Sequence, residues 1–181
     1  YFEKDGAVIS IHAEDPELLK DVDPKKIAAW NKAAGLATKE NRKYTMNDLN
    51  SWCVVSAPTK AWAKKVFPEL SEAQAVEELW TSILDSARVG EDPIKNWNEH
   101  VADMDSHADF LNEKQFRYLH YKNSKGTDLK VELPKNHIWL SAGSKNAKGV
   151  EFIANIPTEE VFTMPKKDGA EGVLYSTKPL N

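Results

Sequence analysis

The segment "SWCVVSAP", residues 51–58, is a short β-branched run that ends at a proline. It predicts a strand buried in a parallel sheet, because strands covered on both faces have continuous apolar sequences. Upstream, "AVISIHA" (7–13) is a second strand candidate. Two Asp-Pro pairs, at 15–16 and 23–24, predict helix starts for "PELLKDV" and "DPKKIAAWNKAAGLATKEN". Alternating strands and helices indicate an α/β fold.

Two longer helices are expected in the middle of the chain. The first begins at Ser71, where Ser71 and Gln74 fit a capping box, and apolar residues then recur at helical spacing. The second begins at Asp92-Pro93 and carries one apolar stripe, formed by Trp97, Val101, Met104, Ala108 and Leu111. Both stripes predict helices packed against a core.

From about Gly126 the apolar period changes from helical to twofold. In "DLKVELP" (128–134) apolar and charged residues alternate, which is typical of a half-buried strand. Further short strands are expected in "HIWLSAG", "GVEFIANIP" and "GVLYSTKPL". The predicted fold class is therefore mixed α/β, with residues 1–125 forming part of an α/β amino-terminal domain and residues 126–181 beginning a β-rich portion.

Composition excludes several classes of function. The net charge of −4 argues against a nucleic-acid partner, and the chain has no apolar run long enough to predict a membrane span. One cysteine, Cys53, excludes an intramolecular disulfide and favours a reducing, cytoplasmic location, with the thiol buried and inert. The chain opens without Met or a signal-peptide pattern, which predicts that it is a piece of a longer polypeptide.

Candidate chemistry is sparse. His100, Asp103 and His107 fall on one side of a predicted helix and could bind a metal, but they flank its apolar stripe, which favours the rim of a packed face. The phosphate-loop patterns and the G-x-S-x-G elbow are absent from the sequence. We therefore assign no catalytic and no substrate-binding residue.

The stretch "NIPTEEVFTMP", residues 155–165, places Glu159 and Glu160 side by side ahead of two apolar residues. The apolar pair should pull the backbone inward, and a carboxylate drawn inward needs a partner. That partner could be a divalent metal or a basic side chain; simple exposure of both carboxylates is the other alternative. Spacing by itself leaves all three open.

The combination of several motifs identifies a family more specifically than the spacing of the two glutamates does. "NIPTEEVFTMP", preceded by "GTDLKVELP" (126–134) and followed by "AEGVLYSTKPL" (170–180), resembles the M29 family of metalloaminopeptidases, and "SWCVVSAPTKAWAKKVFP" (51–68) is similar to that family's middle region. The resemblance covers essentially the whole chain and implies that residues 126–181 begin the family's β-rich catalytic domain. It implies peptide substrates, a homodimer, two divalent ions (cobalt, zinc, magnesium or manganese), and one metal-ligand carboxylate from Glu159 or Glu160.

The same resemblance implies that the other metal ligands, a further Glu, two His and an Asp, lie downstream of residue 181 together with the general base. Residues 1–181 would then hold one of about five ligands, and we expect no hydrolysis from them alone. The alternative is a non-catalytic peptide-binding or interaction module, in which exposed Trp139 and Phe152 would contact a peptide.

Overall fold

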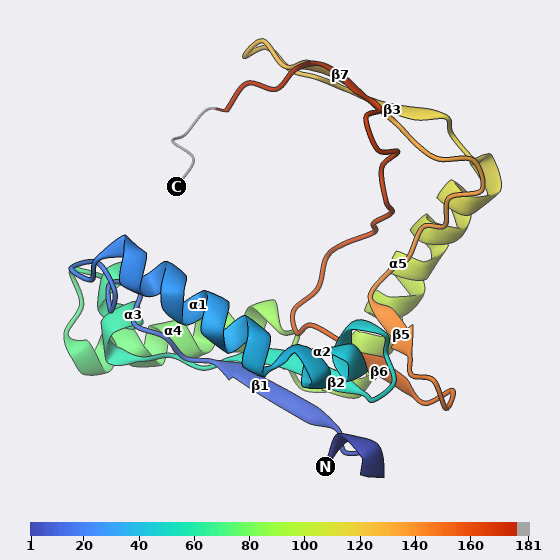
Figure 1. Ribbon diagram of the computed structural model, residues 1–181. Coiled ribbons are helices and arrows are strands. Elements are labelled where there is room, and N and C mark those ends of the chain that lie inside the picture. The colour runs from blue at the N-terminus through green and yellow to red at the C-terminus, as the bar shows by residue number, and fades with distance from the viewer. Residues whose placement is uncertain (177–181) are drawn as a thin grey trace. The chain divides into compact units, whose positions relative to one another are not determined.

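The computed structural model describes residues 1–176 (Figure 1). Two compact units divide the chain, each described here by itself. Unit 1 comprises Tyr1–His100 and Ala142–Thr158, and unit 2 comprises Val101–Ser141 and the residues from Glu159 onward. The sequence predicts one domain boundary, at residue 125. The two units alternate along the sequence, so they do not test that boundary, which stays a prediction.

Unit 1 contains the predicted parallel strand pair. A 3₁₀ turn, Phe2–Lys4, precedes β1 (Val8–His12), which pairs in parallel with β2 (Trp52–Ser56). An isolated parallel bridge joins Val54 of β2 to Asn155. The Val54 N–H donates to the Ala154 carbonyl at 2.8 Å, and the Ile156 N–H donates to the Val54 carbonyl at 2.9 Å. The predicted α/β class is confirmed, although every β2 residue is half-buried and none is fully buried.

Two helices connect these strands, α1 (Pro24–Ala37) and α2 (Lys39–Met46). Asp23 caps α1 by accepting the Lys25 N–H at 2.9 Å, as its Asp-Pro start predicts. The helix expected in "PELLKDV" is wrong, because residues 16–21 form successive turns. Seven residues ending just before the next Asp-Pro are too few to stabilise an α-helix in isolation.

Helices α3 (Lys60–Val66) and α4 (Glu72–Ser86) form the first core of unit 1. Its buried residues are Ala63, Ala75 and Leu79. The predicted capping box is confirmed, with Ser71 and Gln74 bonded reciprocally. Farther on, β5 (Gly143–Lys145) and β6 (Glu151–Ile153) pair as an antiparallel hairpin.

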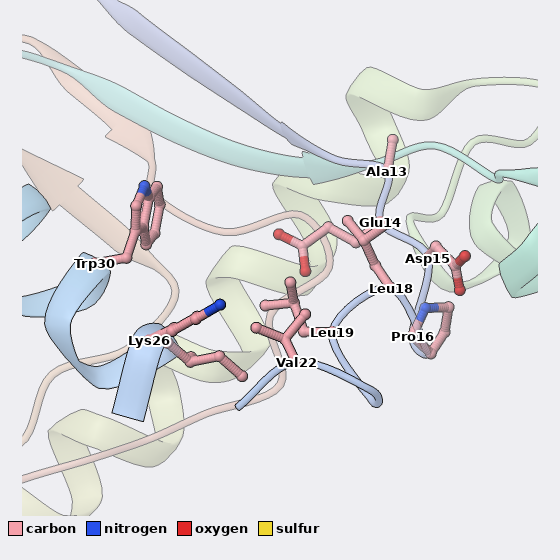
Figure 2. A pocket seen from close by; sticks show the side chains of 10 residues that line it. Ala13, Glu14, Asp15, Pro16, Leu18, Leu19, Val22, Lys26 and Trp30 are labelled. Carbon is pink, nitrogen blue, oxygen red and sulfur yellow. The ribbon is translucent and has the colours of Figure 1, made fainter. Parts of the chain in front are cut away.

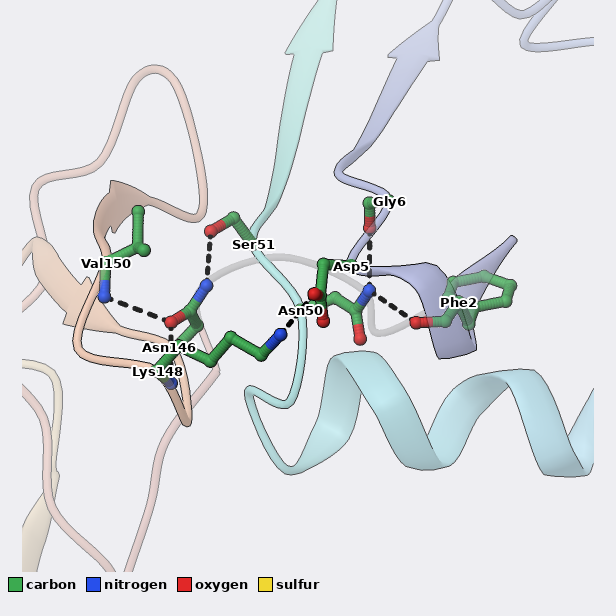
Figure 3. A network of polar contacts seen from close by, with 8 residues as sticks. All are labelled: Phe2, Asp5, Gly6, Asn50, Ser51, Asn146, Lys148 and Val150. Atoms are coloured by element: carbon green, nitrogen blue, oxygen red, sulfur yellow. Dashed lines mark hydrogen bonds and ion pairs between the residues drawn. The ribbon is translucent and has the colours of Figure 1, made fainter.

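Polar contacts attach this hairpin to the start of β2 (Figure 3). Asn146 donates to the Ser51 hydroxyl at 3.0 Å and accepts the backbone N–H groups of Lys148 and Val150. Beside it, buried Asn50 donates to the carbonyls of Phe2 and Gly6 at 3.0 and 2.8 Å. Unit 1 is therefore completed by residues about a hundred positions downstream of β2.

The long helix α5 (Pro93–Lys114) forms where the Asp-Pro start predicts it. The division between the units falls within α5, after His100. On its unit 2 part, Met104 and Ala108 are buried, as the apolar stripe indicates. None of the helices in the described part of the chain is both long and apolar enough to cross a bilayer.

Unit 2 contains a three-stranded antiparallel sheet in the order β3 (Tyr118–Lys122), β4 (Asp128–Glu132) and β7 (Ala170–Val173). Strand β4 confirms the prediction for "DLKVELP", whereas β3 was not expected. Strand β7 covers only the start of the predicted strand "GVLYSTKPL", whose last residues from 177 onward lie outside the described residues. The second core consists of Ala108, Leu133 and Trp139.

The strand expected in "HIWLSAG" is wrong, apart from one bridge between Leu140 and Phe162 and its last residue, Gly143, which begins β5. The Trp139 N–H donates to Asn112 Oδ1 at 2.8 Å, and the Trp139 carbonyl accepts from Asn112 Nδ2 at 3.0 Å. A helix side chain therefore satisfies the backbone groups that a neighbouring strand would otherwise use.

Candidate functional site

The backbone leading to Glu159 is anchored within unit 1. The bridge to Val54 holds residues 154–156, and the following Ile156–Pro157 peptide bond is cis. His100, on α5, lies with its Nε2 atom 2.7 Å from the Thr158 carbonyl oxygen. Since a carbonyl only accepts, Nε2 carries the proton and donates it. The residue just before the glutamate pair is therefore fixed by a side chain 58 positions upstream.

The backbone after Glu160 is anchored within unit 2. Val161 packs against the second core, and Phe162 exchanges two backbone hydrogen bonds of 2.9 Å with Leu140. The Thr163 hydroxyl donates to the Ile138 carbonyl at 2.7 Å. Val161 therefore enters the core as the sequence predicts, while Phe162 stays 47% exposed.

Glu159 and Glu160 are both solvent-exposed. The inward pull of the apolar residues thus ends at Val161 and does not bury the carboxylates. Exposed carboxylate oxygens are the donors that hard divalent cations prefer. Two adjacent glutamates fit such an ion in donor type, but they are fewer than the roughly three or four protein ligands of a typical zinc site.

The other histidine and carboxylate candidates do not assemble into a metal site. His107 Nδ1 is 3.9 Å from Asp103 Oδ2 with both side chains exposed, and His100 faces the Thr158 backbone. Across residues 1–176, no three His, Cys, Asp or Glu side chains come together as a metal-binding group. The interpretation of His100, Asp103 and His107 as flanking a packed face is consistent with these contacts. No sequence pattern indicated the pairing of His100 with Thr158.

A pocket of about 840 Å³ lies in unit 1 beside the loop that follows β1 (Figure 2). Its wall is mainly apolar, with Leu18, Leu19, Val22, Ile27 and Trp30. Glu14, Asp15 and Lys26 add charge at the lining. Neither Glu159 nor Glu160 lines this pocket. The pocket could hold an apolar group, and it offers no arrangement of nucleophile and base.

The alternative of a peptide-binding module required exposed Trp139 and Phe152 side chains, and this expectation is wrong for both residues. Trp139 is only 8% exposed because it belongs to the second core. Phe152 is half-buried and packs against Trp52, with ring centroids 6.2 Å apart. The alternative interpretation took both side chains to be exposed, whereas tertiary packing buries Trp139 and half-buries Phe152.

Cys53 lies on half-buried β2. Burial raises the pKa of its thiol, which lowers the fraction of reactive thiolate at neutral pH. This environment agrees with the expectation of an inert thiol.

Comparisons with known proteins agree along the whole chain. The family model "Thermophilic metalloprotease (M29)" matches residues 1–181. Aminopeptidase AmpS of Bacillus subtilis is 49% identical over 98% of this chain, and aminopeptidase T of Thermus aquaticus is 34% identical over 99%. The structure of wild-type AmpT from Thermus thermophilus matches 99% of this chain with a TM-score of 0.89 and 33% identity.

In each of these three comparisons the chain spans 44% of the relative's length. The match is therefore nearly complete for this chain and partial for each relative. A family model that matches from the first residue to the last establishes membership. Residues 1–181 belong to the M29 family of thermophilic metalloproteases.

Proposed function

We propose that residues 1–181 are part of a metal-dependent aminopeptidase that releases amino-terminal residues from peptides. The observation that carries this proposal is the match of the whole chain to a metalloprotease family in which the similar relatives are named aminopeptidases. The chain spans 44% of the length of these relatives, which supports the proposal that the 181 residues contribute only part of the active site.

In this proposal, Glu159 or Glu160 donates a carboxylate oxygen to one of two divalent ions, with cobalt, zinc, magnesium and manganese as candidates. When bound, such ions polarise the scissile carbonyl and lower the pKa of a water molecule. The anchors on either side of the pair support this role, because a ligand must be held close to its productive position. His100 orients the backbone before the pair, and Val161 fixes the backbone after it.

We further propose a homodimer in the cytoplasm with peptides as substrates. The single cysteine supports a reducing compartment, and the family resemblance supports the dimer and the substrate class. The competing class, a peptide-binding module without catalysis, loses its local support because Trp139 is buried.

The test uses the full-length protein that carries residues 1–181. With Co²⁺ or Zn²⁺, we expect release of the first residue from peptides with a free amino terminus and none from N-acetylated peptides. Removing the metal with a chelator should abolish release, and adding Co²⁺ should restore it. Peptide binding without any cleavage under these conditions would favour the module instead.

Variants at Glu159 and Glu160 identify which of the two glutamates coordinates the metal. We expect Glu159→Gln or Glu160→Gln, whichever removes the ligand, to weaken Co²⁺ binding by more than about 100-fold, beyond the effect usual for outer-shell partners. Glu171→Gln, on exposed β7, is the matched control and should leave affinity unchanged. Unaltered metal affinity in both site variants would contradict the assignment. Residues 1–181 expressed alone should show no hydrolysis.

A further inference from the structure

We propose that His100 is a positioning residue for the carboxylate of Glu159. The inference rests on the proposed function, since it concerns how a metal ligand is held. Its basis is the 2.7 Å contact between His100 Nε2 and the Thr158 carbonyl oxygen, two residues that both belong to unit 1. Thr158 is joined to Glu159 by the next peptide bond.

The geometry of the peptide bond makes this contact relevant to Glu159. The Thr158 carbonyl and the Glu159 nitrogen lie in one rigid plane, because the amide bond resists rotation. A hydrogen bond to that oxygen therefore orients the plane from which the Glu159 side chain departs. The φ of Glu159 and its side-chain torsions then set where the carboxylate lies relative to that plane.

The imidazole ring of His100 is itself held by Trp97. The two rings meet edge to face, with centroids 5.5 Å apart and an interplanar angle of 80°. The Trp97 indole N–H donates to the carbonyl of Ala87 at 2.8 Å. Ala87 is 7% exposed and caps the carboxyl end of α4. A continuous series of contacts thus runs from the end of α4 through Trp97 and His100 to Thr158.

A second anchor acts from the other side of Thr158. The Ile156 N–H donates to the Val54 carbonyl at 2.9 Å, which ties residue 156 to β2. Thr158 is therefore fixed along the backbone by the sheet and at its carbonyl by the helix. Fixing the backbone before a ligand lowers the conformational entropy lost when a metal binds.

The expected loss of metal affinity on removing the His100 donor can be estimated from other hydrogen bonds outside the ligand shell. Removing such a partner typically weakens metal binding by about 10-fold to 100-fold. Here the required feature is one N–H donor at the end of a side chain. His100→Gln keeps such a donor, whereas His100→Leu removes it with little loss of bulk.

The experiment measures Co²⁺ affinity by competition with a chromophoric chelator in the full-length protein, together with melting temperature. We expect His100→Leu to weaken Co²⁺ binding by about 10-fold to 100-fold, and His100→Gln to restore most of the loss. His107→Leu, seven residues along α5 and exposed, is the matched control and should stay close to wild type. Trp97→Phe keeps an aromatic ring without the bond to Ala87, so it should give an intermediate loss.

A second readout does not depend on the metal. In metal-free protein, His100→Leu should accelerate hydrogen exchange at the Ile156 amide, which donates to the Val54 carbonyl just before Thr158, relative to wild type and His107→Leu. Unchanged exchange there, unchanged Co²⁺ affinity while Glu159→Gln weakens it, or a loss of Co²⁺ affinity in Glu160→Gln but not in Glu159→Gln would each overturn the inference and leave the proposed function standing. If wild-type protein binds no Co²⁺, the proposed function fails and the metal role of His100 fails with it, while the exchange data still decide whether His100 fixes this peptide.

Discussion

At the scale of single residues, Glu17 shows how a local charge ties the loop after β1 to a helix. Its carboxylate accepts hydrogen bonds from Lys65 on α3 and from Lys20 in its own loop. The hydrogen bond from Lys65 is the largest cause, followed by that from Lys20, and together they lower the pKa of Glu17 from 4.5 to about 2. The pair is exposed, so its contribution to stability is small.

This lowered pKa predicts a specific pH dependence. A carboxylate whose pKa is depressed in the folded state stabilises that state above its unfolded pKa, and the contribution disappears as the pH falls. The melting temperatures of wild type and Glu17→Gln should therefore differ slightly at neutral pH and converge between pH 4.5 and about 2. Glu69→Gln, at another exposed glutamate, provides the comparison. A difference that persists unchanged below pH 2 would contradict this account.

The limits of sequence reasoning are also visible at single residues. Glu159 and Glu160 stand out in the sequence because of the motif around them, and their anchors could be predicted only in part. Val161 was recognisable as a core residue, since it is apolar and follows two charges. The role of His100 was not, because a hydrogen bond across 58 positions to a backbone carbonyl leaves no pattern in residue type or spacing.

At the scale of elements, local chemistry determined what could be predicted. Helices α1 and α4 begin where Asp23 and Ser71 can cap them, and both capping contacts depend on residues two or three positions apart. Strand β3, with the sequence "YLHYK", was missed because it has no regular alternation and gains its backbone partners from β4. Elements stabilised by distant partners are therefore the ones that local sequence patterns do not predict.

Helix α4 offers a matched pair of leucines for testing its packing. Leu79 is 4% exposed within the first core, whereas Leu84 on the same helix is 40% exposed. Leu79→Ala should cost about 2–5 kcal/mol of unfolding free energy, because it leaves a cavity. Leu84→Ala should cost about 1 kcal/mol or less. Chemical denaturation followed by circular dichroism measures both, and equal losses would show that the first core is not centred on Leu79.

At the scale of the whole molecule, unit 1 is discontinuous along the chain. Its β5–β6 hairpin and the segment up to Thr158 come after the unit 2 residues Val101–Ser141. The mixed α/β class could be predicted because it follows from the order of periodic segments. This interleaving could not, since it is encoded in pairings such as Asn146 with Ser51, 95 positions apart.

Asn146 provides a test of that pairing. Asn146→Ala removes the hydrogen bond to Ser51 and the two bonds that shape the hairpin turn. We expect faster hydrogen exchange at the Val54 and Ile156 amides of unit 1, and no change in the β3–β4 ladder of unit 2. Lys145→Ala, which removes only an exposed ion pair with Glu151, is the control. Equal acceleration in both units would contradict independent anchoring of the hairpin.

The late position of segment Ala142–Thr158 in the sequence also affects how unit 1 folds during translation. When the ribosome has added His100, the residues of β1, β2, α3 and α4 have all been synthesised. The carbonyl of Val54 still lacks its hydrogen bond from the Ile156 N–H. At a translation rate of about 5–20 residues per second, synthesis of the 56 residues after His100, up to Ile156, takes roughly 3–11 s. During that interval the nascent chain carries an unfinished parallel sheet, which makes this the stage at which a ribosome-associated chaperone would be most useful.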